Sequence, residues 1–118
     1  MSLNVLEVAV YAMVMLGGAQ QNFVCESNPT GVRCSHGVAA FPSEKASIMF
    51  SDGTRVSKDA RRLVFSNGLT NFMDSAGWVQ FSNGIGFRRD MRVASRIRFT
   101  SGAMCEQVGE NMARCNKS

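Results

Sequence analysis

The apolar positions along this chain are organised around a four-residue phrase that recurs. Phe50–Gly53, Phe65–Gly68 and Phe81–Gly84 read Phe-Ser-Asp/Asn-Gly and begin 15 and 16 residues apart. A looser copy, Phe99–Gly102, begins 18 residues later, and Cys34–Gly37 begins 16 residues before the first Phe. Asn-Gly or Asp-Gly between runs suited to strands is a strong hairpin signal. A recurring phrase of this kind predicts a series of similar hairpins.

The side chains that flank each phrase decide the register of its hairpin. If Ser-Asn-Gly is a three-residue loop with a left-handed Gly, the Phe opposes the residue after Gly and one face of each hairpin is apolar. The inward-facing sets are then Val32, Cys34, Val38 and Ala40; Ile48, Phe50, Thr54 and Val56; Leu63, Phe65, Leu69 and Asn71; Val79, Phe81, Ile85 and Phe87; and Ile97, Phe99, Ala103 and Cys105. A two-residue turn would make that face half polar, and a slip by one residue would turn the whole set to water. The sequence therefore predicts the three-residue loop.

The predicted fold class is all-β. The chain has 118 residues, which fits one domain. We expect an antiparallel meander of about five hairpins from about Phe23 to Cys115, forming a single curved sheet or small barrel. An apolar N-terminal helix or strand would pack on that sheet. We assign residues 1–19 to the apolar N-terminal segment and residues 20–118 to the β-hairpin repeat domain.

The N-terminal segment has two interpretations. Val5–Leu16 is almost entirely apolar but shorter than the roughly 20 residues of a membrane span. It is either an uncleaved helix or first strand, or the remnant of a secretory signal with Gly17–Ala19 as a small-residue cleavage site. Met1–Asn4 contains no Lys or Arg and Glu7 interrupts the apolar run, which argues against the signal.

The four cysteines lie at the two ends of the repeat series. Cys25 and Cys34 flank one turn-rich stretch, and Cys105 and Cys115 flank another, so we predict these two disulfides among three possible connectivities. Cysteines paired in a small chain are typical of an oxidising compartment, the bacterial periplasm or the outside of the cell. The alternative is a cytoplasmic protein with reduced thiols in its core.

The combination of Phe-Ser-Asn-Gly hairpins and terminal cysteines resembles small, uncharacterised secreted bacterial proteins built on the same phrase. The resemblance covers about Val32 to Cys115. It implies a periplasmic or extracellular β-repeat domain. It brings no known activity and therefore no functional residues.

Charge is the strongest indication of a binding surface. The formal net charge is +4, and the stretch from Arg55 to Arg98 holds nine basic and three acidic residues, a balance of +6. In the predicted register, the outward-facing arginines are Arg33, Arg55, Arg88, Arg98 and Arg114. A basic face beside an exposed aromatic such as Phe72 suits an anionic polymer, and otherwise it is a solvated face. Trp78 is expected to pack under the N-terminal segment, and the alternative is an outward ring beside Gln80 that stacks on a glycan.

No catalytic constellation is visible in the sequence. The only histidine is His36, which occupies a hairpin-loop position, and no nucleophile–histidine motif is present. The cysteine spacing matches no common zinc arrangement, so we predict no metal and no cofactor. We expect a non-catalytic secreted or periplasmic structural or binding module, with binding of an anionic polymer (nucleic acid or acidic glycan) as the alternative. The partner is open: an anionic polymer, another protein, or a second copy joined through sheet edges or the N-terminal segment.

Overall fold

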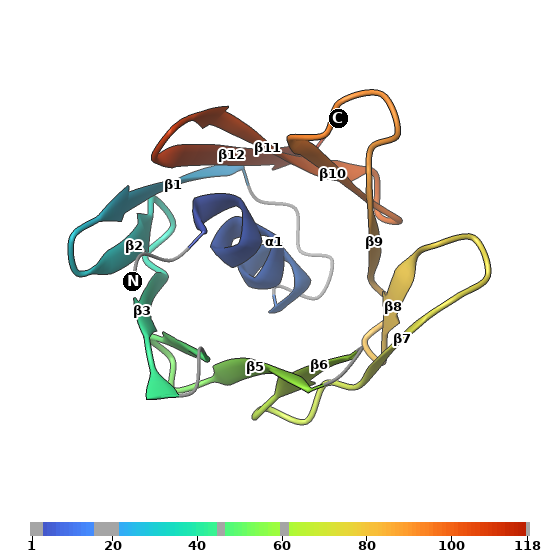
Figure 1. Cartoon of the computed structure of the whole chain (residues 1–118), viewed down its shortest axis with the longest axis horizontal. Coiled ribbons are helices and arrows are strands. Elements are labelled where there is room, and N and C mark those ends of the chain that lie inside the picture. Colours follow the sequence, from blue (N-terminus) through green and yellow to red (C-terminus); the bar gives the residue numbers. More distant parts are fainter. Residues whose placement is uncertain (1–3, 16–21, 45–46, 60–61, 118) are drawn as a thin grey trace.

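The computed structural model of this chain describes residues 4–15, 22–44, 47–59 and 62–117. In this part of the chain, one helix is followed by twelve strands (Figure 1). The helix α1 spans Val5–Met15. The strands of the first half are β1 (Phe23–Asn28), β2 (Gly31–Cys34), β3 (Ala39–Pro42), β4 (Ile48–Phe50), β5 (Arg55–Asp59) and β6 (Arg62–Phe65). Those of the second half are β7 (Asn71–Met73), β8 (Val79–Phe81), β9 (Gly86–Arg89), β10 (Arg96–Phe99), β11 (Ala103–Gly109) and β12 (Met112–Lys117).

The strands form one antiparallel sheet that curls into a nearly closed barrel. Neighbours in sequence pair with each other, and β1 also pairs with β12, which joins the two ends of the meander. Figure 1 shows the resulting ring of strands around α1. The ring is interrupted between β6 and β7, the two ends of the strand order. The predicted all-β antiparallel meander is confirmed.

The predicted register is confirmed in four of the five phrase hairpins. Val32 pairs with Ala40, Ile48 with Val56, Val79 with Phe87, and Ile97 with Cys105. The loop glycines have the left-handed conformation that a three-residue loop requires, with φ of 94° at Gly53 and 91° at Gly84. Each phrase therefore directs one apolar face of its hairpin into the barrel.

The hairpin between β6 and β7 is the exception. Leu63 and Asn71 were predicted to oppose each other, but no ladder joins their strands. Instead, the Leu63 N–H donates to Asn71 Oδ1 (3.2 Å) and Asn71 Nδ2 donates to the Leu63 carbonyl oxygen (2.6 Å). Because the amide side chain occupies the backbone groups of Leu63, the backbones stay apart. We call this interruption between β6 and β7 the seam.

Helix α1 forms the centre of the core. Asn4 caps its first turn, since the Glu7 N–H donates to Asn4 Oδ1 (3.1 Å). Nine of its 11 residues are buried, which fits a helix that is apolar on all sides. The predicted N-terminal packing element is therefore a helix, and it lies inside the barrel. The proposed cleavage site Gly17–Ala19 lies outside the described residues. Within the described residues, no helix has the length and hydrophobicity of a membrane span.

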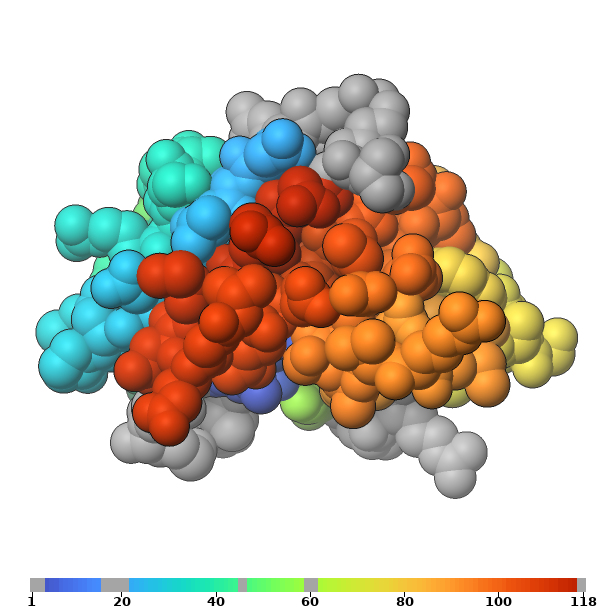
Figure 2. All heavy atoms as spheres, turned by 90° about the horizontal axis from the view of Figure 1, so that it is seen from above, coloured from blue at the N-terminus to red at the C-terminus, as the bar shows by residue number. Residues whose placement is uncertain are grey.

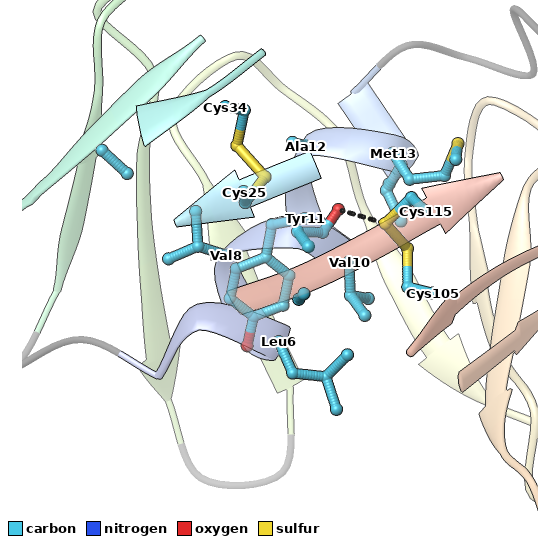
Figure 3. Close-up of a cluster of buried hydrophobic side chains, with 14 of the residues drawn as sticks. Leu6, Val8, Val10, Tyr11, Ala12, Met13, Cys25, Cys34, Cys105 and Cys115 are labelled. Atoms are coloured by element: carbon cyan, nitrogen blue, oxygen red, sulfur yellow. Dashed lines mark hydrogen bonds between the residues drawn. A yellow bond between two sulfur atoms is a disulfide. The ribbon is translucent and has the colours of Figure 1, made fainter. Parts of the chain in front are cut away.

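The size of the inward-facing side chains follows the position of the helix. α1 packs against β1, β2, β11 and β12, where the inward residues include Cys25, Cys34, Ala113 and Cys115 (Figure 3). On the remaining strands phenylalanines fill much of the interior, and the helix meets them through Tyr11, whose ring lies edge-on to Phe65 with centroids 5.9 Å apart. Their rings are in contact along the wall in the order Phe65, Phe81, Phe87, Phe99, with centroids 5.5–6.1 Å apart. Small residues where the helix backbone packs closely and large ones on the remaining strands give an even packing of the interior.

The two predicted disulfides are present. Cys25 is bonded to Cys34 across β1 and β2, and Cys105 to Cys115 across β11 and β12. All four cysteines are buried, and Cys115 Sγ lies 3.7 Å from the Ala9 carbonyl oxygen of the helix (Figure 3). The disulfides thus tie together the strands on which the helix rests. They also indicate an oxidising compartment.

Candidate functional site

The five arginines predicted to face outward alternate with inward residues, but they do not gather in one place. Arg88 of β9 and Arg98 of β10 are direct cross-strand partners. Phe87 and Phe99, the next pair along these strands, face the interior. Two like charges directly opposite each other repel, so their guanidinium groups must be held by other contacts or balanced by an anion.

The other three predicted arginines lie apart from this pair. Arg33 is opposite Glu26 and Arg114 is opposite Glu106, so a carboxylate faces each of them. An open hollow over β1 and β2 is lined by both Arg33 and Glu26, whose opposite charges cancel. Arg55 lies on β5, on the opposite side of the ring (Figure 1). The predicted set is therefore not a continuous basic face.

Trp78 joins the Arg88–Arg98 pair, which corrects the expectation that it packs under the N-terminal segment. The Arg88 guanidinium carbon lies 5.0 Å from the centre of the Trp78 ring, a cation–π contact. Arg88 Nη1 also donates to the Ala76 carbonyl oxygen (3.1 Å). Val79 takes the inward position, so the alternation of the strand turns its neighbour Trp78 outward. Trp78 therefore faces outward and fixes the position of Arg88.

Asp90 fixes the position of Arg98. Its side chain is only 7% exposed, and Oδ2 accepts a 2.6 Å hydrogen bond from Arg98 Nε. Oδ1 accepts from the backbone N–H of Arg92 (2.7 Å) and of Val93 (3.3 Å), which folds the connection after β9 back over the strand. The Arg92 N–H and the Arg98 guanidinium lower the pKa of Asp90 to about 2. The carboxylate is therefore charged at any physiological pH.

A second ion pair, between Arg96 and Glu106, lies beside Asp90, and its two charges cancel. Arg96 Nη2 is 2.9 Å from Glu106 Oε2, while Arg96 Nη1 is 3.8 Å from Asp90 Oδ2. This arginine is engaged by two carboxylates and has little charge to offer an external anion. The positive charge available to an anion therefore lies on the side of Asp90 that faces Arg88 and Arg98, away from Arg96.

These side chains surround an open hollow of about 250 Å³. Its walls are Trp78, Arg88, Arg89, Asp90, Met91, Arg92 and Arg98. Four arginines and one buried carboxylate leave a balance of +3, and we call this hollow the arginine groove. Figure 2 shows the face of the barrel formed by β10 to β12 (orange to red), with the connection after β9 at its edge. Because Asp90 and Trp78 hold two of the arginines, the groove is organised before any ligand arrives.

Sequence reasoning identified two members of the arginine groove and missed the rest. Arg88 and Arg98 were found from the alternation of the strands. Met91 and Arg92 were not, because they lie in a connection where alternation makes no prediction, and Arg89 was not, because alternation assigns it with its partner Ile97 to the inward face. The signal that was available is the 18-residue interval between the last two full phrases, which places an extra loop next to this strand pair.

The described residues contain no group of three or more potential metal ligands. All four cysteines are disulfide-bonded, and His36 stacks on Phe23 with ring centroids 4.0 Å apart. Burial lowers the pKa of His36. His36 thus packs as a neutral aromatic residue in its turn.

No protein-family profile, no curated protein and no solved structure matches this chain. The arrangement of its side chains is therefore the basis for a functional assignment.

Proposed function

We propose that this protein is an exported, non-catalytic module that binds an anionic polymer in the arginine groove. The observation that carries the proposal is the adjacent pair of Arg88 and Arg98, each held by its own protein contacts. Asp90 takes only the Nε of Arg98, so the two terminal nitrogens have no protein hydrogen bond among the described residues. An anion that bridges the two guanidinium groups relieves their mutual repulsion.

The kind of cation in the groove favours phosphate, sulfate or carboxylate groups. All four cations are arginine, whose planar fork forms paired hydrogen bonds with oxyanions. Trp78 at the edge of the groove and the exposed Phe72 on β7 offer ring faces to a base or a sugar. Nucleic acids and acidic glycans share this combination of repeated anionic groups and flat rings.

Export is part of the same proposal. Two buried disulfides form and persist in an oxidising environment such as the periplasm or the cell exterior. Intact-mass analysis of the protein from its natural host, after alkylation with and without reduction, tests this part. We expect two disulfides in that material, and four free thiols would contradict export.

Binding is tested with heparin and with a single-stranded oligothymidylate, by titration at several salt concentrations. The test variant is Arg88→Ala/Arg98→Ala, and the control is Arg33→Ala/Arg55→Ala, which removes the same charge elsewhere. Each phosphate contact contributes about 0.7 to the salt slope for a single strand, so the test variant should reduce the slope by about 1.4. The control should change it little.

Two results would contradict the proposal. One is the absence of binding to both probes at low salt. The other is an equal loss of affinity in the test and control variants, because that would reflect the net charge of the protein and not the arginine groove.

A further inference from the structure

A second hollow lies between the helix and two strands of the barrel wall. Its volume is about 180 Å³, and its lining residues come from α1, from the preceding Asn4, and from β9 and β10. The closest strand neighbours of the helix are β1, β2, β11 and β12. The space toward β9 and β10 is left to side chains, which do not fill it. We call this space the helix hollow.

The inner part of the helix hollow is apolar. Leu6 and Val10 lie one turn apart on the same side of the helix and line the hollow from there (Figure 3). Phe87 and Ile97 line it from the sheet. An apolar cavity of about 150 Å³ holds a benzene molecule, so the helix hollow has room for a body of about six carbon atoms.

The open end of the helix hollow carries hydrogen-bond donors. Its two exposed lining residues are Asn4 and Arg89. Arg89 is the last residue of β9 and opposes the inward Ile97, so its side chain starts on the inner face of the sheet. Its Nη1 donates to the Ala94 carbonyl oxygen, while Nε and Nη2 have no hydrogen bond with a described residue. Asn4 Oδ1 accepts the Glu7 N–H, which leaves the Asn4 amide nitrogen as a donor.

Glu7 is the acidic residue of the hollow, and other groups already balance its charge. Oε1 accepts from the Tyr11 hydroxyl (3.0 Å) and lies 3.3 Å from Lys58 Nζ. Oε2 accepts from the same ammonium (3.4 Å). Arg89, in contrast, forms no ion pair with a side chain that the structure describes. An anionic group at the open end would therefore supply the partner that Arg89 lacks.

We propose that the helix hollow binds a small carboxylate with an apolar body of about six carbon atoms. The apolar body lies between the helix and Phe87. The carboxylate oxygens accept from Arg89 and Asn4 at the open end. Among the described residues, Arg89 alone lines both this hollow and the arginine groove. The ligand differs from the polymer of the arginine groove because it needs an enclosed apolar body and only one negative charge.

The test compares ligands that differ in one feature at a time. Hexanoate, 1-hexanol and hexylamine have chains of the same length with different head groups, and butanoate is a shorter carboxylate. In a titration followed by ¹H–¹⁵N NMR, we expect hexanoate to bind at least tenfold more tightly than hexanol or hexylamine. Its shift changes should lie in α1, β9 and β10. Each methylene removed weakens binding about fourfold, so butanoate should bind roughly 15-fold more weakly than hexanoate.

The Arg89→Gln variant tests the carboxylate contact. Glutamine keeps a donor but removes the positive charge from an exposed side chain. We expect this variant to bind hexanoate at least tenfold more weakly and hexanol as the unchanged protein does. Arg33→Gln, which removes the same charge from β2, is the matched control and should bind hexanoate normally.

A second variant tests the apolar part of the helix hollow. Leu6→Phe places a larger side chain there and should weaken hexanoate and hexanol alike. If this variant does not fold, the exposed Arg89→Gln substitution still decides the result. The Arg88→Ala/Arg98→Ala variant should bind hexanoate as the unchanged protein does, which separates the helix hollow from the arginine groove.

Three results would overturn the proposal. The first is no binding of hexanoate, or binding of hexylamine or hexanol that is as tight. The second is equal binding of hexanoate by Arg89→Gln and Arg33→Gln. The third is loss of hexanoate binding in Arg88→Ala/Arg98→Ala, with shift changes around Trp78 in the unchanged protein, which would assign the carboxylate to the arginine groove.

Discussion

The side-chain amide of Asn71 makes both hydrogen bonds to the Leu63 backbone that a neighbouring strand would make. The equivalent inward positions in other hairpins hold apolar residues, such as Val56, Phe87 and Cys105. An amide that points inward must find partners, because an unsatisfied polar group in the interior is costly. The Leu63 backbone supplies those partners. Its N–H and C=O are then no longer available for a ladder between β6 and β7.

Replacing Asn71 by Ala should therefore destabilise the protein. The Leu63 N–H and C=O would lose their partners in a half-buried site, and we expect the free energy of unfolding to fall by about 1–3 kcal/mol. Urea denaturation measures the change. Thr70→Ala is the control, because Thr70 is an exposed neighbour in the same hairpin. An Asn71→Ala protein as stable as the control would show that the amide does not hold the seam.

Much of this arrangement could be predicted from the repeated phrase. Its alternation defined which side chains face inward and thus the register of four hairpins. The seam was present in the same pattern, since Asn71 is the one amide in the five inward sets. Its effect was missed because alternation assigns a side chain to a face but does not say whether a polar group there will bond to a side chain or to the backbone.

The position of the helix could not be predicted in this way. An all-apolar segment has no polar face to orient it, so Val5–Met15 is compatible with packing on a sheet or within a barrel. The small inward residues at Cys25, Cys34 and Ala113 leave the space for it, but only once the ring is closed. Trp78 precedes the inward-facing Val79, so the alternation itself turns Trp78 outward, and the expectation that it packs under the N-terminal segment set this pattern aside.

The two disulfides should contribute similarly to stability. They close loops of similar length, with sequence separations of 9 and 10 residues. The chain-entropy estimate for such loops is about 2–3 kcal/mol each. We expect Cys25→Ala/Cys34→Ala and Cys105→Ala/Cys115→Ala each to lower the free energy of unfolding by that amount in urea denaturation. Variants with unchanged stability would contradict a structural role for the bonds.

The barrel should not remain folded without its helix. A chain that begins at Gln20 lacks α1, whose nine buried residues fill the space beside β1, β2, β11 and β12. The inward cysteines and alanines of those strands are too small to close the gap, so we expect loss of cooperative thermal unfolding and binding of a hydrophobic dye. A synthetic peptide of residues 1–19 should restore the transition. A truncated chain with an unchanged melting temperature would place the helix outside the essential core.

Asp90 should make stability depend on pH only in strong acid. Its folded-state pKa is lowered from 3.8 to about 2, chiefly by the Arg92 N–H and then by Arg98. The unfolded chain therefore takes up the proton at higher pH than the folded protein does. The stabilisation is fully present above about pH 5, declines from about pH 4, and is lost as the pH falls through about 2. The stability difference between the unchanged protein and Asp90→Asn should follow this course in urea denaturation.

Arg98→Ala separates the two causes of this pKa. Removing the guanidinium should raise the pKa of Asp90 only part of the way to its usual value, because the hydrogen bonds from the Arg92 and Val93 N–H groups remain. An NMR titration of the Asp90 carboxyl carbon measures both proteins directly. A full return to about 3.8 would mean that Arg98 alone holds the carboxylate and that the connection after β9 does not. An unchanged pKa would mean that Arg98 is free to leave Asp90, and the groove would then lack the prior organisation on which its proposed affinity for an anion rests.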